Sequence, residues 1–275
     1  MSYDEIVYEV SDRIATITLN RPDKLNAWTF KMESEYKRAM AEAEQSDEVR
    51  VIIVTGAGRG FCAGADLGLL QSVMGGKLDT SELEAGTVTF GNGQSVPEDF
   101  KKQYSFPLSV SKPIIAAVNG PAVGIGLVHA LYCDMRFSSD LARFGTAFAQ
   151  RGLIAEHGIS WLLPRIVGID NALDLLYSAR MIDAEEALRM RLVTRVVPHD
   201  DLLPTVRTYA AQLATLSSPR SMREIKREVW GAMLMNLGEA ADIAVNDMLE
   251  SFGSDDFREG VLAFMEKRPP QFTGK

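Results

Sequence analysis

Two glycine-rich turns each follow an apolar strand pattern and lead into a helical pattern, and both could do chemistry through their main chain. Residues 49–54 run into GRGFCAGADLGLL, with a helix expected near Asp66, and residues 114–118 run into GPAVGIGLVHAL. The first N–H groups of a helix lack an intrahelical acceptor and point outward. A single turn of this kind is compatible with a plain strand-to-helix connection. Two sets of free amides that converge on one oxygen would form an oxyanion hole.

Five motifs, in order along the chain, carry a resemblance to a known family. They are NRPDKLNA at 20–27, GFCAGADL at 60–67, AVNGPAVGIG at 117–126, RGLIAEHG at 151–158 with LPR at 163–165, and DFREG at 256–260 with Phe264 and Lys267 after it. Together they resemble the crotonase superfamily, the enoyl-CoA hydratase/isomerase family, over essentially the whole chain. The resemblance implies an α/β fold, a spiral of strand-strand-helix units with a C-terminal helical region that builds trimers or dimers of trimers, and acyl-CoA substrates.

The resemblance also implies which residues form the site. The backbone N–H groups of Ala65 and Ile125 would hold the thioester oxygen. The acyl-CoA would be bound by Lys24, Leu25, Ala63, Asp66, Leu67 and Gly124, and Phe264 with Lys267 would reach the adenine end in a neighbouring subunit. An enolate oxygen carries the charge that develops when a proton leaves the carbon next to the carbonyl, and prepositioned amides stabilise that charge. Coenzyme A is then part of the substrate, and we expect no separate cofactor and no metal.

The chain departs from the hydratase pattern at the two positions where hydratases of this family carry catalytic glutamates. The register of the glycine-containing segments places Val128 at the first position and Phe148 at the second. Neither side chain can move a proton or orient a water molecule. A hydratase that relies on those two carboxylates is therefore not expected.

Glu156 falls where the isomerases of 3-enoyl-CoA to 2-enoyl-CoA in this family carry their single catalytic glutamate. One carboxylate suits an isomerase, which removes a proton at one carbon and returns it two carbons away. The alternative is a solvated residue near the start of the helix expected at 158, where the helix dipole favours a carboxylate. The register favours the catalytic interpretation.

Three other side chains are of types that can do chemistry. His157 could pair with Glu156, but adjacent residues in a helix do not face each other, so capping or exposure is the preferred interpretation. His129, on an apolar helix, is expected to be a satisfied interior histidine and is kept as a reserve base. Cys62 is expected to pack as a small apolar residue, because neither a base nor a cation is near it in sequence.

Apolar periodicity predicts strands at 6–10, 14–19, 49–54, 114–118 and 193–197, and helices at 27–45, 124–133, 170–179 and 183–190. Strands separated by helices indicate an α/β core at 1–199 that holds the acyl-CoA site. Helical patterns with breaks at 217–219, 238 and 253 fill 200–275, which we expect to mediate oligomerisation and to cover the CoA. The segment 75–97, rich in Gly, Ser and Thr, is expected to be a mobile excursion over the ligand.

Composition excludes several other classes of protein. The 275 residues include 29 Lys and Arg against 37 Asp and Glu, a net charge of −8, so nucleic acid is an improbable partner. Two cysteines give neither a disulfide framework nor a zinc site. The acidic N-terminus lacks a signal-peptide pattern, and apolar runs are too short to span a bilayer. A cytoplasmic protein without a membrane partner is the expectation.

Three function classes remain open from the sequence. The preferred one is an acyl-CoA double-bond isomerase that shifts a 3-enoyl-CoA to a 2-enoyl-CoA through a dienolate. The alternatives are a hydratase or hydrolase that uses a different base, and a catalytically silent CoA-binding member of the family. The acyl group's length, branching or ring character, and the choice between trimer and hexamer, have no sequence signal.

Overall fold

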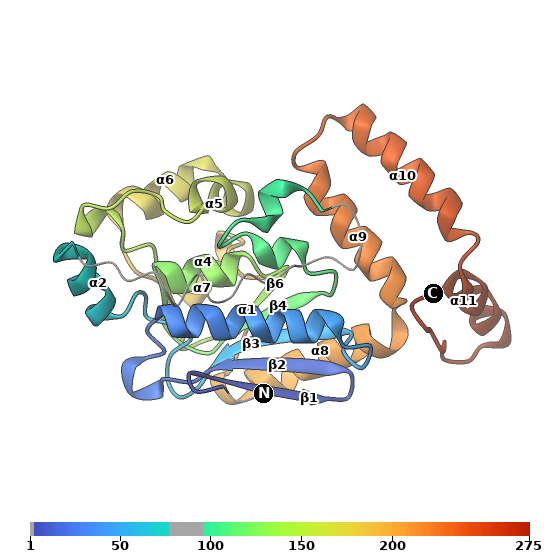
Figure 1. The fold of residues 1–275 in the computed structure, drawn as a ribbon, viewed down its shortest axis with the longest axis horizontal. Helices are drawn as coiled ribbons and strands as arrows, with labels where there is room; N and C mark the ends of the chain where they lie inside the picture. Colours follow the sequence, from blue (N-terminus) through green and yellow to red (C-terminus); the bar gives the residue numbers. More distant parts are fainter. Residues whose placement is uncertain (1–2, 77–95) are drawn as a thin grey trace.

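A computed structural model describes residues 3–76 and 96–275, and its largest element is a six-stranded sheet in the order β1-β2-β3-β4-β6-β9 (Figure 1). The strands are β1 (Ile6–Ser11), β2 (Ile14–Leu19), β3 (Val51–Gly56), β4 (Ile114–Val118), β6 (Met135–Ser139) and β9 (Arg195–Val197). A hairpin joins β1 and β2 through Asp12 and Arg13, which both have positive φ as such a two-residue turn requires. All other neighbours in this sheet are parallel.

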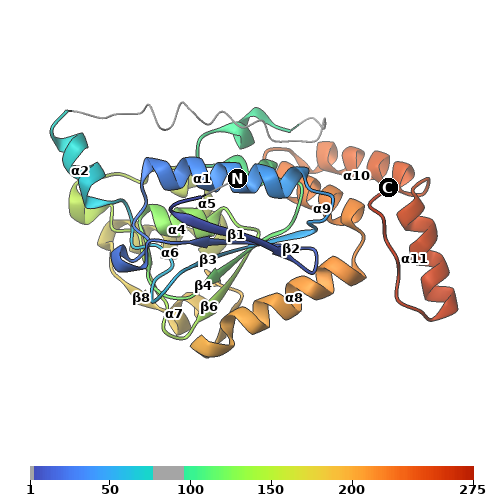
Figure 2. The ribbon, with the colours of Figure 1, turned by 60° about the horizontal axis from the view of Figure 1, so that its bottom comes forward.

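Both faces of the sheet are covered, so its strands are apolar on both sides. Ile52 and Val54 of β3 belong to the cluster beneath α1 (Phe30–Gln45) and α4 (Ile125–Leu131), whereas Val51 and Ile53 pack with α8 (Leu202–Leu216). Figure 2 shows α1 and α8 on opposite sides of the sheet. Strands buried on both faces read as continuous β-branched runs, as the sequence of β3 does.

The remaining core elements follow β4 and surround a second, three-stranded sheet in the order β5-β7-β8. This sheet contains β5 (Ala122–Val123), β7 (Arg143–Gly145) and β8 (Ile182–Asp183). The helices around it are α5 (Ile159–Val167), α6 (Ile169–Ser178) and α7 (Ala184–Arg189). Short 3-10 helices lie at Pro22–Lys24, Glu98–Lys101, Phe106–Ser109, Ala149–Arg151 and His199–Asp201. Together these elements place the second glycine-rich turn beside the first.

The C-terminal helices project from one end of the molecule. They are α9 (Pro219–Ala232), α10 (Leu237–Ser251) and α11 (Asp255–Glu266), and Figure 1 shows α10 and α11 extending away from the sheet. No residue of α10 is buried in the single chain. The predicted helical region 200–275 therefore divides into α8 and α9, which pack against the core, and α10 and α11, which reach outward. The predicted boundary at 199/200 falls before a helix of the core.

The α/β class and most predicted elements are confirmed, with differences that have physical reasons. The helix predicted from residue 27 begins at Phe30, because Thr29 caps it by accepting a hydrogen bond from the Met32 amide. The predicted break at 238 was wrong, since the chain breaks at 233–236 and Asn236 caps α10 in a capping box. Strands β5 to β8 were not predicted. Three of them have only two or three residues, too short to show a period.

Helix α2 (Leu67–Met74) follows the first glycine-rich turn. The predicted excursion at 75–97 lies almost entirely in residues 77–95, outside the described part of the chain. Within residues 3–76 and 96–275, no helix combines the length and apolar character needed to cross a membrane.

Candidate active site

The first glycine-rich turn leaves the amide of Ala65 without a main-chain acceptor within the described residues. The Trp28 amide donates to Gly64 O at 2.8 Å, and the Asp66 amide donates to Trp28 O at 2.9 Å. These two bonds form a parallel bridge between Trp28 and Ala65. Because such a bridge uses the main-chain groups on either side of the bridged residue, the N–H of Ala65 points away from Trp28.

The second glycine-rich turn presents the amide of Ile125 in a similar way. Ile125 is the first residue of α4, so its N–H has no acceptor within the helix. The preceding Gly124 has φ of +54°, a conformation that favours glycine, and its amide donates to Gly145 O at 2.9 Å. The turn is thereby fixed to β7.

Close backbone contacts hold the two turns together. The Cys62 amide donates to Pro121 O at 3.0 Å, and the Val123 amide donates to Cys62 O at 2.9 Å. A Cβ added at Gly126 would lie 2.2 Å from Cys62 O, so only glycine permits this approach. Ala65 and Ile125 line the same cavity, which has a volume of about 870 Å³. The two amides therefore come from turns that meet at one site, as an oxyanion hole requires.

The cavity contains most of the residues that the sequence singled out. Its lining includes Lys24, Ala63, Ala65, Asp66, Leu67, Gly124, Ile125 and Glu156. It also includes polar side chains that the sequence did not identify as site residues: Arg21, Gln103, Tyr104, Thr146, Arg151 and His157. Gln103 and Tyr104 belong to a segment without a recognisable motif, so no sequence signal marked them.

Three predicted binding residues do not line this cavity. Leu25 contributes its main chain instead, as its carbonyl accepts a hydrogen bond from the Ala63 amide at 3.0 Å. Phe264 and Lys267 lie at the end of α11, and Figures 1 and 2 both place α11 at the opposite end of the molecule from α2, which lines the cavity. The side chain of Phe264 is 86% exposed. These two residues cannot complete the site of their own chain, and their role in a neighbouring subunit stays a prediction.

The two carboxylates of the cavity have opposite electrostatic environments. Burial by itself would raise the pKa of Asp66, but a hydrogen bond from the Gly68 amide and the Arg21 guanidinium 3.0 Å away together lower the pKa of this carboxyl. Burial raises the pKa of Glu156, whose side chain is 31% exposed. A carboxylate stabilised in its charged form is a weak base, whereas Glu156 has the environment of a general base.

His157 lies beside Glu156, with Nε2 3.5 Å from Oε2. The predicted capping or exposed position for this histidine was wrong, because His157 lies in a turn before α5 with φ of +59° and not within a helix. Its carbonyl accepts a hydrogen bond from the Tyr132 hydroxyl at 2.9 Å, and its ring lies 4.2 Å from the Tyr104 ring. Burial lowers the pKa of His157, so the imidazole is neutral at pH 7. The pair therefore combines a carboxylate with a neutral imidazole.

The hydratase positions are occupied as the register indicated. Val128 is fully buried in α4 and does not line the cavity, whereas Phe148 is buried and does line it. Neither residue supplies a proton or a hydrogen bond through its side chain. Glu156 and Asp66 are the carboxylates that the described cavity presents.

Behind the cavity wall lies a buried acid–imidazole pair. His129 is 1% exposed, its ring stacks on Trp28 at a centroid distance of 3.8 Å, and its Nε2 is 3.8 Å from Oε2 of Glu33. His129 is interior, as predicted, but neither of its ring nitrogens has a hydrogen-bond partner within the described residues. Glu33 is fixed by Trp28 Nε1 at 2.8 Å and Lys37 Nζ at 2.9 Å. Neither His129 nor Glu33 lines the cavity, so the pair is assigned no catalytic role.

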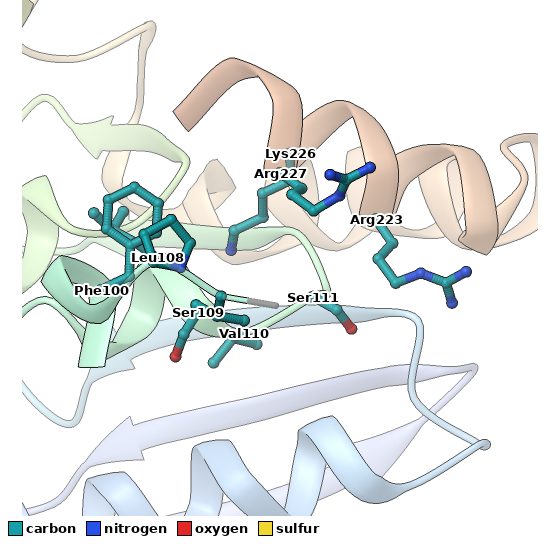
Figure 3. Close-up of a pocket in the computed structure, with 10 residues that line it drawn as sticks. Phe100, Leu108, Ser109, Val110, Ser111, Arg223, Lys226 and Arg227 are labelled. Atoms are coloured by element: carbon teal, nitrogen blue, oxygen red, sulfur yellow. The ribbon is translucent and has the colours of Figure 1, made fainter. Parts of the chain in front are cut away.

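A much smaller cavity of about 40 Å³ lies between α9 and the segment at 107–111, and Figure 3 shows the basic side chains beside it. Lys226 is 2.8 Å from Asp134, and Arg227 is 2.6 Å from Asp247. Asp134 also accepts a hydrogen bond from the Ile114 amide at 2.8 Å. Lys226 thus connects α9 to the start of β4 through Asp134, and Arg227 connects α9 to α10. Both cations are engaged within the fold, so we do not assign this small cavity as an anion site.

Cysteine and metal chemistry receive no support from the geometry. Cys62 and Cys133 are buried free thiols, and burial raises the pKa of each to about 12. Such thiols stay protonated at pH 7, which agrees with the packing role predicted for Cys62. Across the described ranges, no three His, Cys, Asp or Glu side chains gather as metal ligands.

Comparisons with known proteins show which proteins this chain is similar to. A family model described as enoyl-CoA hydratase/isomerase matches residues 9–275. The chain is 39% identical to a probable enoyl-CoA hydratase of Rhodobacter capsulatus over 277 residues, covering all of both chains. It is 34% identical to the 1,2-epoxyphenylacetyl-CoA isomerase of Escherichia coli, covering 98% of each. A solved enoyl-CoA hydratase subunit from Geobacillus kaustophilus superposes with a TM-score of 0.85 at 33% identity, covering 99% of each chain.

Proposed function

The chain belongs to the enoyl-CoA hydratase/isomerase family, whose members act on acyl-CoA thioesters, and we propose that its reaction is the shift of a 3-enoyl-CoA double bond to the 2-enoyl position. The observation that carries this proposal is the pairing of an oxyanion site with one available base. Ala65 and Ile125 offer amides to the thioester oxygen, and Glu156 lines the same cavity with a raised pKa.

The proposed reaction needs these groups and no water. Glu156 removes a proton from C2 of the substrate, and the negative charge spreads over a dienolate whose oxygen is held by the two amides. The same proton returns from Glu156 to C4, which moves the double bond from C3=C4 to C2=C3. Substrate and product are isomers, so the base ends the cycle in the state in which it began. A raised pKa suits a group that must take up a proton and then release it.

One charged group near the first turn suits the coenzyme A portion. Lys24 and Arg21 both line the cavity, but the Arg21 guanidinium already pairs with Asp66 at 3.0 Å and with Glu5 at 3.3 Å. A lysine ammonium binds phosphate in proteins, so Lys24 is the cation that we assign to the coenzyme A phosphates. Asp66 acts in this proposal as the partner of Arg21 and not as the base.

Hydration of a 2-enoyl-CoA is the second candidate, and the Glu156–His157 contact is the observation that favours it. A hydratase needs one group to activate water and another to deliver a proton, and these two side chains lie 3.5 Å apart on one wall. Many relatives carry hydratase names, including the one from Rhodobacter capsulatus. We favour isomerisation because both residues come from one short turn, whereas the two positions of the hydratase glutamates hold Val128 and Phe148.

The test is a direct comparison of the two reactions on the wild-type protein. Conversion of a 3-enoyl-CoA to its 2-enoyl isomer and hydration of the 2-enoyl-CoA are followed separately by product chromatography. We expect isomerisation to be much faster than hydration. Hydration that exceeds isomerisation would overturn the proposal and favour the Glu156–His157 pair as a hydratase site, and binding of both substrates without turnover would favour a silent family member.

A further inference from the structure

A second cavity lies back to back with the proposed active site. It has a volume of about 480 Å³ and lies between the loop at 148–155 and helices α5 and α6. Phe148 and Leu153 line both this cavity and the larger one. We propose that the second cavity is the subsite for the distal hydrocarbon end of a long acyl chain, and that Phe148 and Leu153 form the divide that such a chain must pass. This inference rests on the proposed acyl-CoA reaction and names the substrate class that the same site takes.

The divide is part of a turn whose main chain is held by three internal hydrogen bonds. The amides of Arg151 and Leu153 both donate to Phe148 O, at 2.9 and 3.0 Å, and the Gly152 amide donates to Ala149 O at 3.1 Å. Gly152 has φ of +71°, and beyond its chain neighbours no atom of residues 3–76 or 96–275 lies within 4 Å of where its Cβ would be. The backbone of the divide is therefore fixed by its own hydrogen bonds, and any opening between the cavities must come from side chains.

The two side chains of the divide differ in how firmly they are held. Phe148 is 5% exposed, and its ring lies edge-on to the His157 ring at a centroid distance of 6.3 Å. Leu153 is 40% exposed, so it has fewer packing contacts and can change rotamer at little cost. We therefore assign the passage to Leu153 and the fixed wall to Phe148.

The lining of the second cavity matches hydrocarbon and not the polar part of a substrate. Among the described residues that line it, none is charged, and the hydroxyl groups come from Ser160 and Tyr177. The others are apolar: Phe148, Ala149, Leu153, Ile154, Ala155, Pro164, Ile169, Ala172, Leu173 and Leu176. A phosphate or carboxylate would lose its hydration here without a compensating partner. A methylene chain would gain from leaving water.

The second cavity shares two lining residues with the proposed active site, and for this reason we propose the acyl chain, and not another apolar molecule, as its occupant. Lys24, which suits the coenzyme A portion, lines the other cavity, and so does Glu156, the proposed base. Ala155, which precedes Glu156, already lines the second cavity. An acyl chain whose C2 to C4 atoms lie at Glu156 therefore meets the divide next, and the second cavity offers room beyond it.

Phe148 stands where hydratases of the family carry their second catalytic glutamate, and this replacement affects both cavities. Phe148 removes a carboxylate from the active site and supplies an aromatic wall to both cavities. An ionised carboxylate at this position would be costly to place against an apolar cavity. The apolar residue is consistent with a hydrocarbon chain on its far side.

The experiment measures affinity against chain length with saturated acyl-CoA thioesters, which cannot isomerise. Butanoyl-, octanoyl-, dodecanoyl- and hexadecanoyl-CoA are titrated by calorimetry against the wild-type protein. Each methylene group that enters the second cavity should lower Kd by about fourfold, so affinity should keep rising beyond octanoyl-CoA until the cavity is filled. A Kd that does not change beyond octanoyl-CoA overturns the proposal.

Ser160→Phe fills the second cavity without altering the active-site lining, because Ser160 is exposed on α5 and lines only the second cavity. We expect this variant to bind butanoyl-CoA with the wild-type Kd, whereas its Kd for the long-chain thioesters should no longer fall with chain length. Thr208→Phe, a similar change at an exposed position of α8 outside both cavities, is the matched control. Leu173→Trp, at the half-exposed rim of the second cavity, replaces Ser160→Phe if the latter does not fold.

The outcomes separate this proposal from the proposed reaction. If Ser160→Phe and Thr208→Phe bind all four thioesters alike, long chains lie elsewhere, for example on the exposed apolar side chains of α11, and the subsite proposal is wrong. If the Kd of the wild type falls with chain length but the protein turns over no 3-enoyl-CoA, the subsite proposal is supported and the isomerase proposal is wrong. If the protein isomerises 3-enoyl-CoA but its Kd does not depend on chain length, the isomerase proposal is supported and the subsite proposal is wrong.

Discussion

Replacement of Glu156 by Gln should abolish most isomerisation while leaving acyl-CoA binding intact. Gln keeps the shape of the side chain and its place beside His157, but it cannot accept a proton. The change therefore isolates the proton transfer from the geometry of the turn.

The expected magnitude depends on whether another group in the cavity can replace Glu156. Asp66 cannot do so efficiently, because the Gly68 amide and Arg21 hold its carboxylate in the charged form. His157 is neutral and could accept a proton, but its Nε2 lies 3.5 Å from Glu156 Oε2 and not at the position of the carboxylate oxygen, and burial makes it a weaker base than a free histidine. The loss should accordingly approach the full contribution of a general base, about 10² to 10⁴ in kcat. This corresponds to about 2.7 to 5.4 kcal/mol of transition-state stabilisation.

The pH dependence provides an independent check on the same residue. Because burial raises the pKa of Glu156, the acid limb of wild-type kcat/KM should lie above the usual range of a glutamate, and activity should fall as pH falls through it. In Glu156→Gln that limb should disappear from the residual rate. Glu156→Asp should keep a limb with reduced activity, since the carboxylate remains but is one methylene group further from the substrate.

Stability should change in the direction opposite to activity. A carboxyl whose pKa is higher in the folded than in the unfolded state favours folding when protonated, so its contribution is fully present below the unfolded pKa and is lost as pH rises through the folded pKa. In the wild type, ionisation of the buried Glu156 carboxyl lowers the stability at pH 7. Gln does not ionise, so the Tm of Glu156→Gln should equal or exceed the wild-type value at pH 7. The difference should vanish at acid pH, which thermal unfolding by circular dichroism measures.

The assay compares initial rates of 3-enoyl-CoA isomerisation and the Kd for a saturated acyl-CoA in all variants. Glu9→Gln on the exposed edge strand β1 makes the same charge change far from the cavity lining and serves as the control. Wild-type turnover in Glu156→Gln would remove this residue from the mechanism. Lost turnover together with lost binding would show that the side chain acts in binding instead.

The oxyanion site and the assembly give two further predictions. Ala65→Pro removes the main-chain donor and should lower kcat by at least about 10², whereas Ala65→Gly keeps the N–H and should remain close to wild type; equal activity of the two folded variants would exclude the Ala65 amide. The exposed apolar side chains of α10 and α11, among them Leu237 and Phe264 at 86% exposure each, should be covered by association into a trimer or a dimer of trimers. Light scattering at micromolar concentration measures this, and a monomer there would count against both the assembly and the cross-subunit role of Lys267.

Local sequence was sufficient to locate the two glycine-rich turns that form the proposed oxyanion site. A β-branched run followed by glycines and a helical pattern is determined by short-range sterics and by the free amides of a helix N-terminus. The choice of Ala65 and Ile125 within these turns came from the resemblance to the family, and both residues line the cavity. The cap at Asp183, where a helix was predicted to begin, is equally local. Thr29 caps α1 by the same kind of bond, but the sequence pattern placed the start of that helix too early, at residue 27 instead of Phe30.

Tertiary structure alone decided which groups share the cavity and what lies beyond it. The neighbouring side chains of Glu156 and His157 meet because a positive φ at His157 turns the chain, and Tyr104 joins them from a segment with no motif. The order of the strands and the packing of α8 on the sheet are likewise long-range. The second cavity exists because the loop at 148–155 and helices α5 and α6 leave a space between them. Such a space is set by the packing of side chains from distant residues, and no local pattern in a sequence encodes it.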